Sequence, residues 1–259
     1  MNVLLLTDFS SGARHAHKYA LNLFSGQDVN YYLLHSHYNT DFKDNQNLEE
    51  TDNLKREMKL YNYWGFNESN LSIIKTSKRL IDAIRHLMKS EVIDLVVMGA
   101  SGNSNRLTNQ LGNNTSSTAT KIKCPVLIVF EESVIKEPLN VAFPVDYTDQ
   151  LQVNCVKKIK SLPTSHNFTI EVFEINSKTS AHLLTKYSKQ ILQKGLDKLN
   201  IIYKKNENFN ICQLETHNKK DFDLISFAAK NLSVYNKVFN QLKNLKDLKK
   251  HPPLYILHA

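Results

Sequence analysis

The stretch Asp94-Leu-Val-Val-Met-Gly99-Ala-Ser-Gly102, followed after nine residues by Gly112-Asn-Asn-Thr115, decides the fold. The aliphatic run at 93–98 is typical of a buried strand, and the segment after Gly112 is predicted to be a helix, 114–122. Glycines in such a loop let the backbone turn sharply and approach a ligand, because no Cβ stands in the way. A strand, a glycine loop and a helix in this order predict an anion site at the helix N-terminus.

Strand and helix patterns alternate on both sides of this stretch. We predict strands at 2–7, 29–35, 71–75, 93–98 and 126–130, and helices at 11–24, 48–63, 78–90 and 114–122. This alternation indicates right-handed crossovers and a mostly parallel sheet that is covered on both faces. Ligands bind such sheets beyond the carboxyl ends of the strands, which here are 7–10, 35–37 and 99–115.

The pattern occurs twice in the chain. Val3–Ser10 resembles Val141–Thr148, Asp94–Ser101 resembles Asp223–Lys230, and Cys124–Val129 resembles Pro252–Leu257. Three matches in the same order indicate a duplicated unit of about 125 residues. The predicted fold class is therefore α/β, with two tandem doubly wound parallel-sheet units at 1–133 and 138–259. The charged segment between them ends in a proline, which cannot continue a helix, and is the predicted linker.

The spacing G-x2-G-x9-G, with Asp8 after the first strand and Cys124-Pro-Val-Leu-Ile-Val129 as the last strand, resembles the universal stress protein family. The resemblance covers nearly all of the first copy and, more faintly, all of the second. It implies a tandem member built of two adenine nucleotide alpha hydrolase-like units. In that family, Ser or Thr after the last glycine marks the members that bind ATP, whereas this chain has Asn113. Losing one donor among several costs on the order of 1 to 2 kcal/mol, so binding is expected to weaken but survive.

The resemblance and the residues together predict a nucleotide site in the first copy, for ATP with Mg or a related adenine nucleotide. The expected contact residues are Thr7, Asp8, Phe9, Ser36, Met98, Gly99, Gly102, Gly112, Asn113, Asn114 and Thr115. Unpaired N–H groups at the helix start would face a phosphate, and Asp8 would accept a hydrogen bond from a ribose hydroxyl or the adenine amine. Alternatively, Asp8, Asn113 or Asn114 serves only as a helix cap.

The second copy lacks the glycine loop. At the corresponding place it reads Ala228-Ala-Lys-Asn231-Leu-Ser-Val-Tyr235, and Gly195 is the only glycine in 138–259. Side chains there would obstruct the approach of a ligand to the backbone, so no nucleotide is expected in this copy. Its expected role is to pack against the first copy.

No catalytic or metal site is predicted. His35 and His37 share a strand face, but no third ligand is near them in the sequence, so a structural role is favoured. Asp8 belongs at the sugar end of the ligand, so at most slow hydrolysis of ATP stays open. Cys124, Cys155 and Cys212 are odd in number and widely spaced, which indicates neither disulfides nor a zinc site.

The net charge of +8 comes from the second copy, because residues 1–137 hold 15 basic and 15 acidic residues and residues 138–259 hold 18 and 10. All 18 basic residues are lysines. Proteins that read nucleic acids rely on arginine for bidentate contacts, so a nucleic-acid partner is not expected. With neither a membrane-spanning run nor a signal peptide in the sequence, a cytoplasmic location is expected.

Two functions fit these observations. In the first, the N-terminal copy binds an adenine nucleotide, and the protein is a sensor or regulator in a stress response. In the second, the chain is a ligand-free interaction module with a relic site, and the last strands, 126–130 and 254–258, mediate its assembly. A homodimer is the expected assembly.

Overall fold

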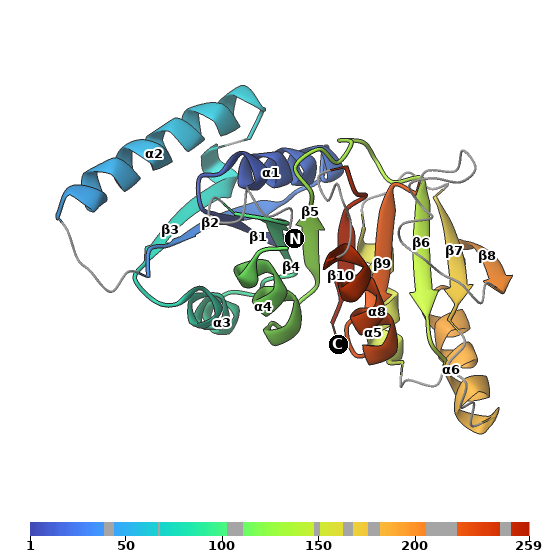
Figure 1. Cartoon of the computed structure of the whole chain (residues 1–259). Helices are drawn as coiled ribbons and strands as arrows, with labels where there is room; N and C mark the ends of the chain where they lie inside the picture. The colour runs from blue at the N-terminus through green and yellow to red at the C-terminus, as the bar shows by residue number, and fades with distance from the viewer. Residues whose placement is uncertain are drawn as a thin grey trace.

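Two series of strands and helices, one in each half of the chain, make up the structure, which is a computed structural model (Figure 1). It describes residues 1–38, 44–66, 68–102, 111–147, 151–162, 168–175, 182–205, 222–243 and 250–258. The first series is β1 Asn2–Thr7, α1 Ser11–Leu23, β2 Asn30–Ser36, α2 Asp44–Tyr63, β3 Leu71–Thr76, α3 Leu80–Ser90, β4 Leu95–Gly99, α4 Asn113–Lys121 and β5 Val126–Val129. The second series is β6 Asn140–Val145, α5 Val153–Lys157, β7 Thr169–Glu174, α6 His182–Gly195, β8 Asn200–Lys205, β9 Leu224–Ala228, α8 Leu232–Lys243 and β10 Leu254–Leu257.

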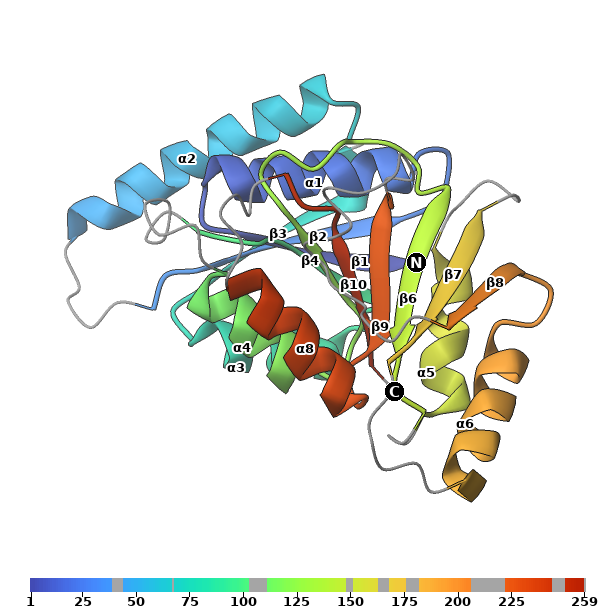
Figure 2. The same ribbon diagram turned by 45° about the vertical axis from the view of Figure 1, so that its right-hand side comes forward.

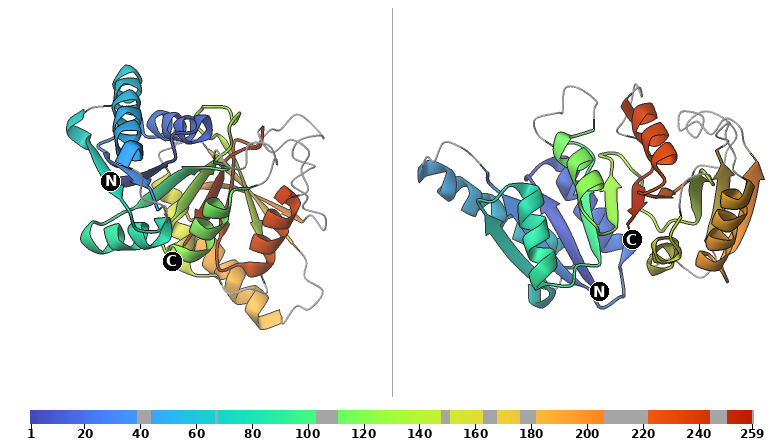
Figure 3. Two further views of the ribbon diagram at one scale, coloured as in Figure 1. Left: turned by 60° about the vertical axis from the view of Figure 1, so that its left-hand side comes forward. Right: turned by 90° about the horizontal axis from the view of Figure 1, so that it is seen from below.

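The strands of both series form one sheet of ten strands in the order β3-β2-β1-β4-β5-β10-β9-β6-β7-β8. Neighbouring strands are parallel within each half, whereas β5 and β10 are antiparallel, with Leu127 opposite Tyr255. The view from below in Figure 3 shows the two halves side by side. The predicted class, α/β with two tandem doubly wound parallel-sheet units, is confirmed. The two strands that were expected to mediate assembly pair with each other inside the chain.

Matching hydrogen bonds at equivalent places show the internal repeat in atomic detail. The main-chain N–H of Asp94 donates to the carbonyl of Asn2, and that of Asp223 donates to the carbonyl of Asn140, both at 2.9 Å. In return, Oδ2 of Asp94 accepts from the N–H of Asn2 at 2.8 Å, and Oδ2 of Asp223 accepts from that of Asn140 at 2.9 Å. An aspartate thus fastens the start of the fourth strand of each copy to the start of its first strand.

The apolar core forms two layers, one on each face of the sheet. Side chains alternate between the faces along a strand, so Val3 and Leu5 belong to one layer and Leu4 and Leu6 to the other. Residues of α1, α2, α5 and α6 complete the first layer, and residues of α3, α4 and α8 complete the second. Figure 2 shows α3, α4 and α8 gathered on one side of the sheet. Within the described residues, no helix combines the length and the apolar character that crossing a bilayer requires.

Candidate functional site

A cleft of about 700 Å³ opens at the carboxyl ends of β1, β2 and β4, beside α3 and α4. It brings together ten of the eleven residues expected from the sequence: Thr7, Asp8, Ser36, Met98, Gly99, Gly102, Gly112, Asn113, Asn114 and Thr115. In doubly wound sheets, the place where the strand order reverses is where ligands bind, and here it lies between β1 and β4. Residues 103–110 of the predicted loop lie outside the described residues.

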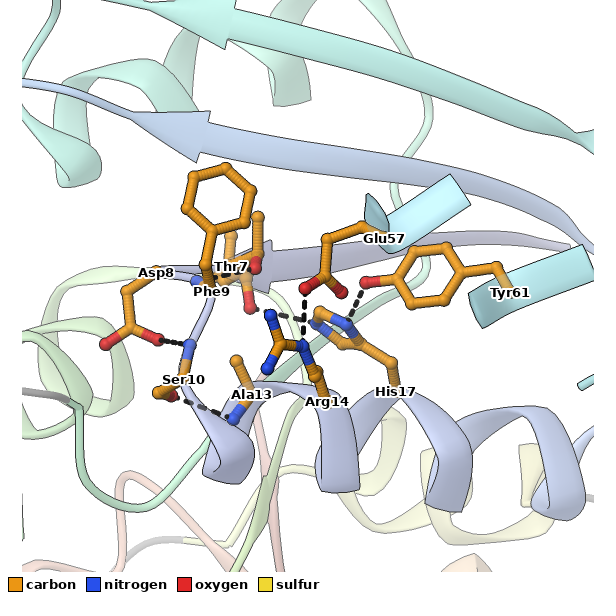
Figure 4. Close-up of polar contacts among 10 residues, drawn as sticks. Thr7, Asp8, Phe9, Ser10, Ala13, Arg14, His17, Glu57 and Tyr61 are labelled. Carbon is orange, nitrogen blue, oxygen red and sulfur yellow. Dashed lines mark hydrogen bonds and ion pairs between the residues drawn. The ribbon is translucent and has the colours of Figure 1, made fainter. Parts of the chain in front are cut away.

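Phe9 is the expected contact residue that is not part of the cleft lining. Its φ is 60°, in the left-handed region, which a residue with a side chain adopts at a cost of on the order of 1 kcal/mol. The N–H of Phe9 donates to Oγ1 of Thr7 at 3.0 Å, and its ring lies 4.4 Å from the ring of His35. Figure 4 shows that the side chains of Phe9 and Asp8 point in different directions from this turn.

The turn after β1 places the carboxylate of Asp8 at the cleft. Oδ1 of Asp8 accepts a hydrogen bond from the N–H of Ser10 at 3.0 Å. The cap of α1 is Ser10 itself, because its Oγ accepts from the N–H of Ala13 at 3.1 Å. Oδ2 of Asp8 lies beside Gly102, where an added Cβ would approach it to 2.5 Å. Asp8 therefore sits between the strand end and the glycine loop and is not the helix cap.

Gly99 has a packing reason to be glycine, in addition to the ligand approach expected from the sequence. A Cβ at this position would lie 2.9 Å from the main-chain carbon of Gly12, in the first turn of α1. A Cβ on Gly12 would in turn lie 3.1 Å from the carbonyl oxygen of Ser101. The end of β4 and the start of α1 thus meet backbone to backbone.

The N-terminus of α4 faces the cleft. Gly112 is the N-cap residue of α4, and its N–H donates to the carbonyl of Ala100 at 2.9 Å, which closes the base of the loop. Oγ1 of the buried Thr115 donates to the carbonyl of Gly99 at 3.1 Å. Asn113 and Asn114 belong to the first helical turn and are not caps. The first N–H groups of a helix have no acceptor inside it, and they carry the positive end of its dipole.

A buried polar network behind the turn joins α1 to α2 (Figure 4). Nε of Arg14 lies 2.5 Å from Oε1 of Glu57, whose side chain is fully buried. Nε2 of His17 bonds the carbonyl of Leu6 at 3.0 Å and Nδ1 bonds the hydroxyl of Tyr61 at 2.5 Å. Burial lowers the pKa of His17 to about 4, so the ring is neutral at pH 7. A neutral ring has one donor, so Nε2–H donates to the carbonyl and Nδ1 accepts from the tyrosine.

His35 and His37 contact the main chain and each other, and Cys124 and Cys155 are buried. Nδ1 of His35 lies 3.0 Å from the carbonyl of Thr7, and the rings of His35 and His37 stack at 6.3 Å. Within the described residues, no three His, Cys, Asp or Glu side chains are grouped so that they could hold a metal. Burial raises the pKa of the Cys124 thiol to about 12 and that of Cys155 to about 11. Cys212 lies outside the described residues.

The sequence analysis did not predict that α3, the residue before it, Tyr38 and the later turns of α4 line the cleft. Tyr38, Arg79, Leu80, Ile81, Asp82, Arg85, Ser117 and Lys121 also line it. The signal was present, because α3 follows β3 and therefore starts at the same edge of the sheet as the glycine loop. The network around Glu57 was also missed, since its members are far apart in the sequence.

At the corresponding place in the C-terminal half, the described residues are close together and buried. Residues 229–231 alone connect β9 to α8, whereas residues 100–112 connect β4 to α4. Nδ2 of Asn231 donates to the carbonyl of Asp146, the counterpart of Asp8, at 2.9 Å. Both Asn231 and Asp146 are 1% exposed. That the second copy binds no nucleotide stays a prediction.

Comparisons with known proteins identify the family of the N-terminal half and the fold of the whole chain. Residues 1–129 match the model of the universal stress protein family. The structure of a universal stress protein from Archaeoglobus fulgidus has a TM-score of 0.63 at 9% identity, over 100% of this chain and 96% of that chain. A functionally unknown protein from Pseudomonas aeruginosa has a TM-score of 0.52 at 14% identity, over 99% and 92% of the two chains.

The fold also occurs in a protein with a different description. The cytoplasmic domain of a prokaryotic cation chloride cotransporter has a TM-score of 0.52 at 10% identity, over 100% of this chain and 95% of that chain. No curated protein matches the chain. At these identities the structural likeness shows the fold alone, and function has to be argued from the site.

Proposed function

The N-terminal half of the chain, residues 1–129, belongs to the universal stress protein family, and from this premise we propose that it binds an adenine nucleotide such as ATP in the cleft. The observation that carries the proposal is that Asp8 and the first turn of α4 line one cleft. The whole protein then acts as a sensor or regulator in a stress response. We place the boundary between its two units in the segment 134–137, between β5 and β6.

The residues at the sheet edge suit a nucleoside. The exposed carboxylate of Asp8 accepts a hydrogen bond from a ribose hydroxyl or from the adenine amine, as the family resemblance implies. Leu6, Ile81 and Met98 give the cleft an apolar part against which a base packs. Oγ of Ser36 donates to the carbonyl of Lys78 at 2.7 Å, which fixes the wall of this part.

The glycine loop suits the phosphates. A Cβ on Gly102 would approach Oδ2 of Asp8 to 2.5 Å, so glycine keeps open the place where the nucleoside end of the cleft meets the loop. The hydroxyl of Thr115 already donates its hydrogen bond to the carbonyl of Gly99. The main-chain N–H groups at 113–115 therefore supply the phosphate contacts. The side-chain amides of Asn113 and Asn114 add donors. Mg²⁺ would be held chiefly by water and by the phosphate oxygens themselves.

We propose that the cleft binds its ligand, with at most slow hydrolysis of ATP. The acids in its lining are Asp8, at the nucleoside end, and Asp82, on α3. Hydrolysis of ATP requires a group that positions the attacking water at the terminal phosphate, together with bound Mg²⁺. Asp8 is at the wrong end of the ligand for this task.

A ligand-free interaction module is the second candidate function. The observation that favours it is the C-terminal half, in which the described residues at the corresponding place are buried and the last strand pairs with β5. Because this pairing already uses both of those strands, a homodimer would form through another surface, such as the sheet edges β3 and β8.

Thermal melting with and without Mg-ATP tests the proposal. A ligand at 100 times its Kd adds about 2.7 kcal/mol to the free energy of unfolding, so the melting temperature of the whole chain should rise. Asp8→Asn should reduce the rise, whereas Asp28→Asn, the same change at an exposed site in the loop before β2, should keep it. An unchanged melting temperature at millimolar ATP would remove the proposal and favour the interaction module.

A further inference from the structure

The turn that carries Asp8 has a strained shape. Phe9, the next residue, has a φ of 60°, and a residue with a side chain keeps this conformation only where the surrounding contacts hold it. Inside the turn, the N–H of Phe9 donates to Oγ1 of Thr7 at 3.0 Å. The N–H of Ser10 donates to Oδ1 of Asp8, also at 3.0 Å. These two bonds shape the turn, but they do not attach it to the rest of the protein.

Two histidines bond the main chain just before this turn. Nδ1 of His35, on β2, lies 3.0 Å from the carbonyl of Thr7. Nε2 of His17, on α1, lies 3.0 Å from the carbonyl of Leu6. The pairing of β1 with β4 ends at Leu5, so these bonds act on the part of β1 that extends beyond it. Because α1 follows the turn, the bond from His17 joins the two ends of the turn and fixes how the chain passes from β1 into α1.

A tyrosine of α2 holds the ring of His17 from behind (Figure 4). Burial, and next the charge of Glu57, raise the pKa of Tyr61 above its ordinary value, so its hydroxyl keeps the proton. The hydroxyl lies 2.5 Å from Nδ1 of His17 and donates to it. A donor at Nδ1 keeps the proton of the neutral ring on Nε2, the atom that faces the carbonyl of Leu6. The side chains of His17, Glu57 and Tyr61 are fully buried, so water does not compete for these bonds.

Aromatic packing fixes the ring of Tyr61 without the help of its hydroxyl. The ring lies 5.6 Å from the ring of Trp64 and 5.0 Å from that of Phe66, and Phe66 in turn lies 4.8 Å from Tyr31 of β2. The substitution Tyr61→Phe therefore removes the hydrogen bond to His17 and keeps these ring contacts. It separates the hydrogen bond from the packing of α2.

The C-terminal half has a different arrangement at the equivalent positions. When the first strands of the two halves are aligned, Tyr147 and Cys155 are the counterparts of Phe9 and His17. Tyr147 is not among the described residues with a positive φ. The thiol of Cys155 donates to the carbonyl of Leu257 in β10, at 3.1 Å, and so does not hold the end of β6. The strained turn and the histidine behind it thus occur in the half that has the cleft.

We propose that α2 positions the ligand-binding carboxylate of Asp8, and that Tyr61 and His17 are positioning residues for the nucleotide. The inference rests on the proposed nucleotide binding. Neither residue lines the cleft, so both act through the end of β1 and make no contact with the ligand. Apparent affinity falls with the fraction of molecules in which the site has its binding shape. Without the bond from Tyr61, the strained turn relaxes in more of the molecules, and Asp8 leaves its place in the cleft.

Calorimetric titration of the full chain with ATP tests the positioning role. Tyr61→Phe should weaken ATP binding roughly three- to tenfold, as the loss of one hydrogen bond that holds the binding shape implies. His17→Gln, which removes the ring between Tyr61 and Leu6, should weaken it at least as much. Tyr255→Phe is the matched control, because Tyr255 of β10 is also buried and its hydroxyl donates to the carbonyl of Lys158 at 3.3 Å. This variant should keep the affinity of the wild type.

The same substitutions in the Asp8→Asn background distinguish positioning from a general loss of stability. If Tyr61 acts by placing the carboxylate of Asp8, Tyr61→Phe should cost little further affinity once that carboxylate is gone. Wild-type affinity in both Tyr61→Phe and His17→Gln, or a loss that persists undiminished in Asp8→Asn, would overturn the positioning role and leave nucleotide binding intact. A wild-type chain that binds no ATP would overturn both.

Discussion

The two halves of the chain have the same strand order but differ at the edge where a ligand would bind. Asp8 in the N-terminal half is exposed at the cleft, whereas Asp146 at the corresponding position is 1% exposed. The strand register, the aspartates before β4 and β9 and the apolar layers are alike in both halves. The difference lies in the connections, since 13 residues join β4 to α4 and three join β9 to α8. The sheet therefore supplies a common scaffold, and the connection after the fourth strand differs in length where the N-terminal cleft opens.

The first helix of each half differs as well. α1 has 13 residues and starts against the end of β4, whereas α5 has five residues. Because α1 approaches so closely, position 99 requires glycine, while its counterpart Ala228 has a side chain. The glycines of the N-terminal half thus serve the packing of α1 as well as the approach of a ligand.

The largest effect is expected at the junction of the halves. Leu127 is fully buried and pairs with Tyr255 across β5 and β10. Leu127→Ala should lower the free energy of unfolding by about 2 to 5 kcal/mol, through lost burial and the cavity left behind. Urea unfolding measures this loss, and size-exclusion chromatography should show an unchanged size. A chain that keeps its stability but halves in apparent mass would instead place these strands between protomers.

The next largest loss of stability is expected for a substitution of Gly99, with its counterpart Ala228 as the comparison. Gly99→Ala should destabilise the protein by about 1 to 3 kcal/mol, because the new Cβ meets the backbone of Gly12, which cannot rotate away. Ala228→Gly should cost roughly 0.5 to 1 kcal/mol from chain entropy, and about 0.8 kcal/mol more because Ala228 is buried and loses its methyl group. Both values come from urea unfolding. Wild-type stability in Gly99→Ala would show that α1 does not impose the glycine.

The buried histidine of the N-terminal half should make stability depend on pH. The pKa of His17 is about 4 in the folded protein and about 6.5 in the unfolded chain. As the pH falls, the unfolded chain therefore takes up a proton at a higher pH than the folded protein does, and this favours unfolding. The contribution of His17 is complete above pH 6.5 and is lost as the pH falls towards 4. The loss is on the order of 2 kcal/mol at pH 5.

Unfolding free energies at pH 7.5 and pH 5 measure this contribution. His17→Gln should show a smaller drop between the two pH values than the wild type. His86→Gln, at an exposed position on α3, should show the drop of the wild type. Burial also lowers the pKa of His251 and of His258 to about 4, so part of the drop should remain in His17→Gln. If His17→Gln and the wild type lost the same free energy, His17 would not contribute to it.

The smallest effect is expected in the C-terminal half. Asn231→Gly removes the hydrogen bond to the carbonyl of Asp146 and should cost about 1 kcal/mol, measured by urea unfolding. It should not create a nucleotide site, because the three-residue connection stays as short as before. Nucleotide binding gained by this variant would mean that the side chain alone closes the second copy.

Much of the fold followed from the sequence because buried parallel strands are continuous apolar runs. The predicted strand at 2–7 has the bounds of β1, and the predicted helix at 114–122 lies within one residue of α4. The helix predicted at 48–63 begins earlier, at Asp44, because the polar residues at its start show no apolar period.

Less of the site was predictable. The glycines and Asp8 stand out because their spacing is local in the sequence. Arg85 and Lys121 are 36 residues apart and meet only when α3 packs against α4. The N-cap at Ser10 and the ion pair of Arg14 with Glu57 likewise depend on side-chain geometry, which the spacing of residues in the sequence does not reveal.

The stoichiometry of ATP binding to the full-length chain tests the asymmetry between the halves most directly. Calorimetry or native mass spectrometry should find one nucleotide per chain, held by the N-terminal half. Gly102→Val should abolish this binding, because its side chain would occupy the space beside Asp8. Two nucleotides per chain, or one that remains bound to Gly102→Val, would contradict the assignment of the site to the N-terminal cleft.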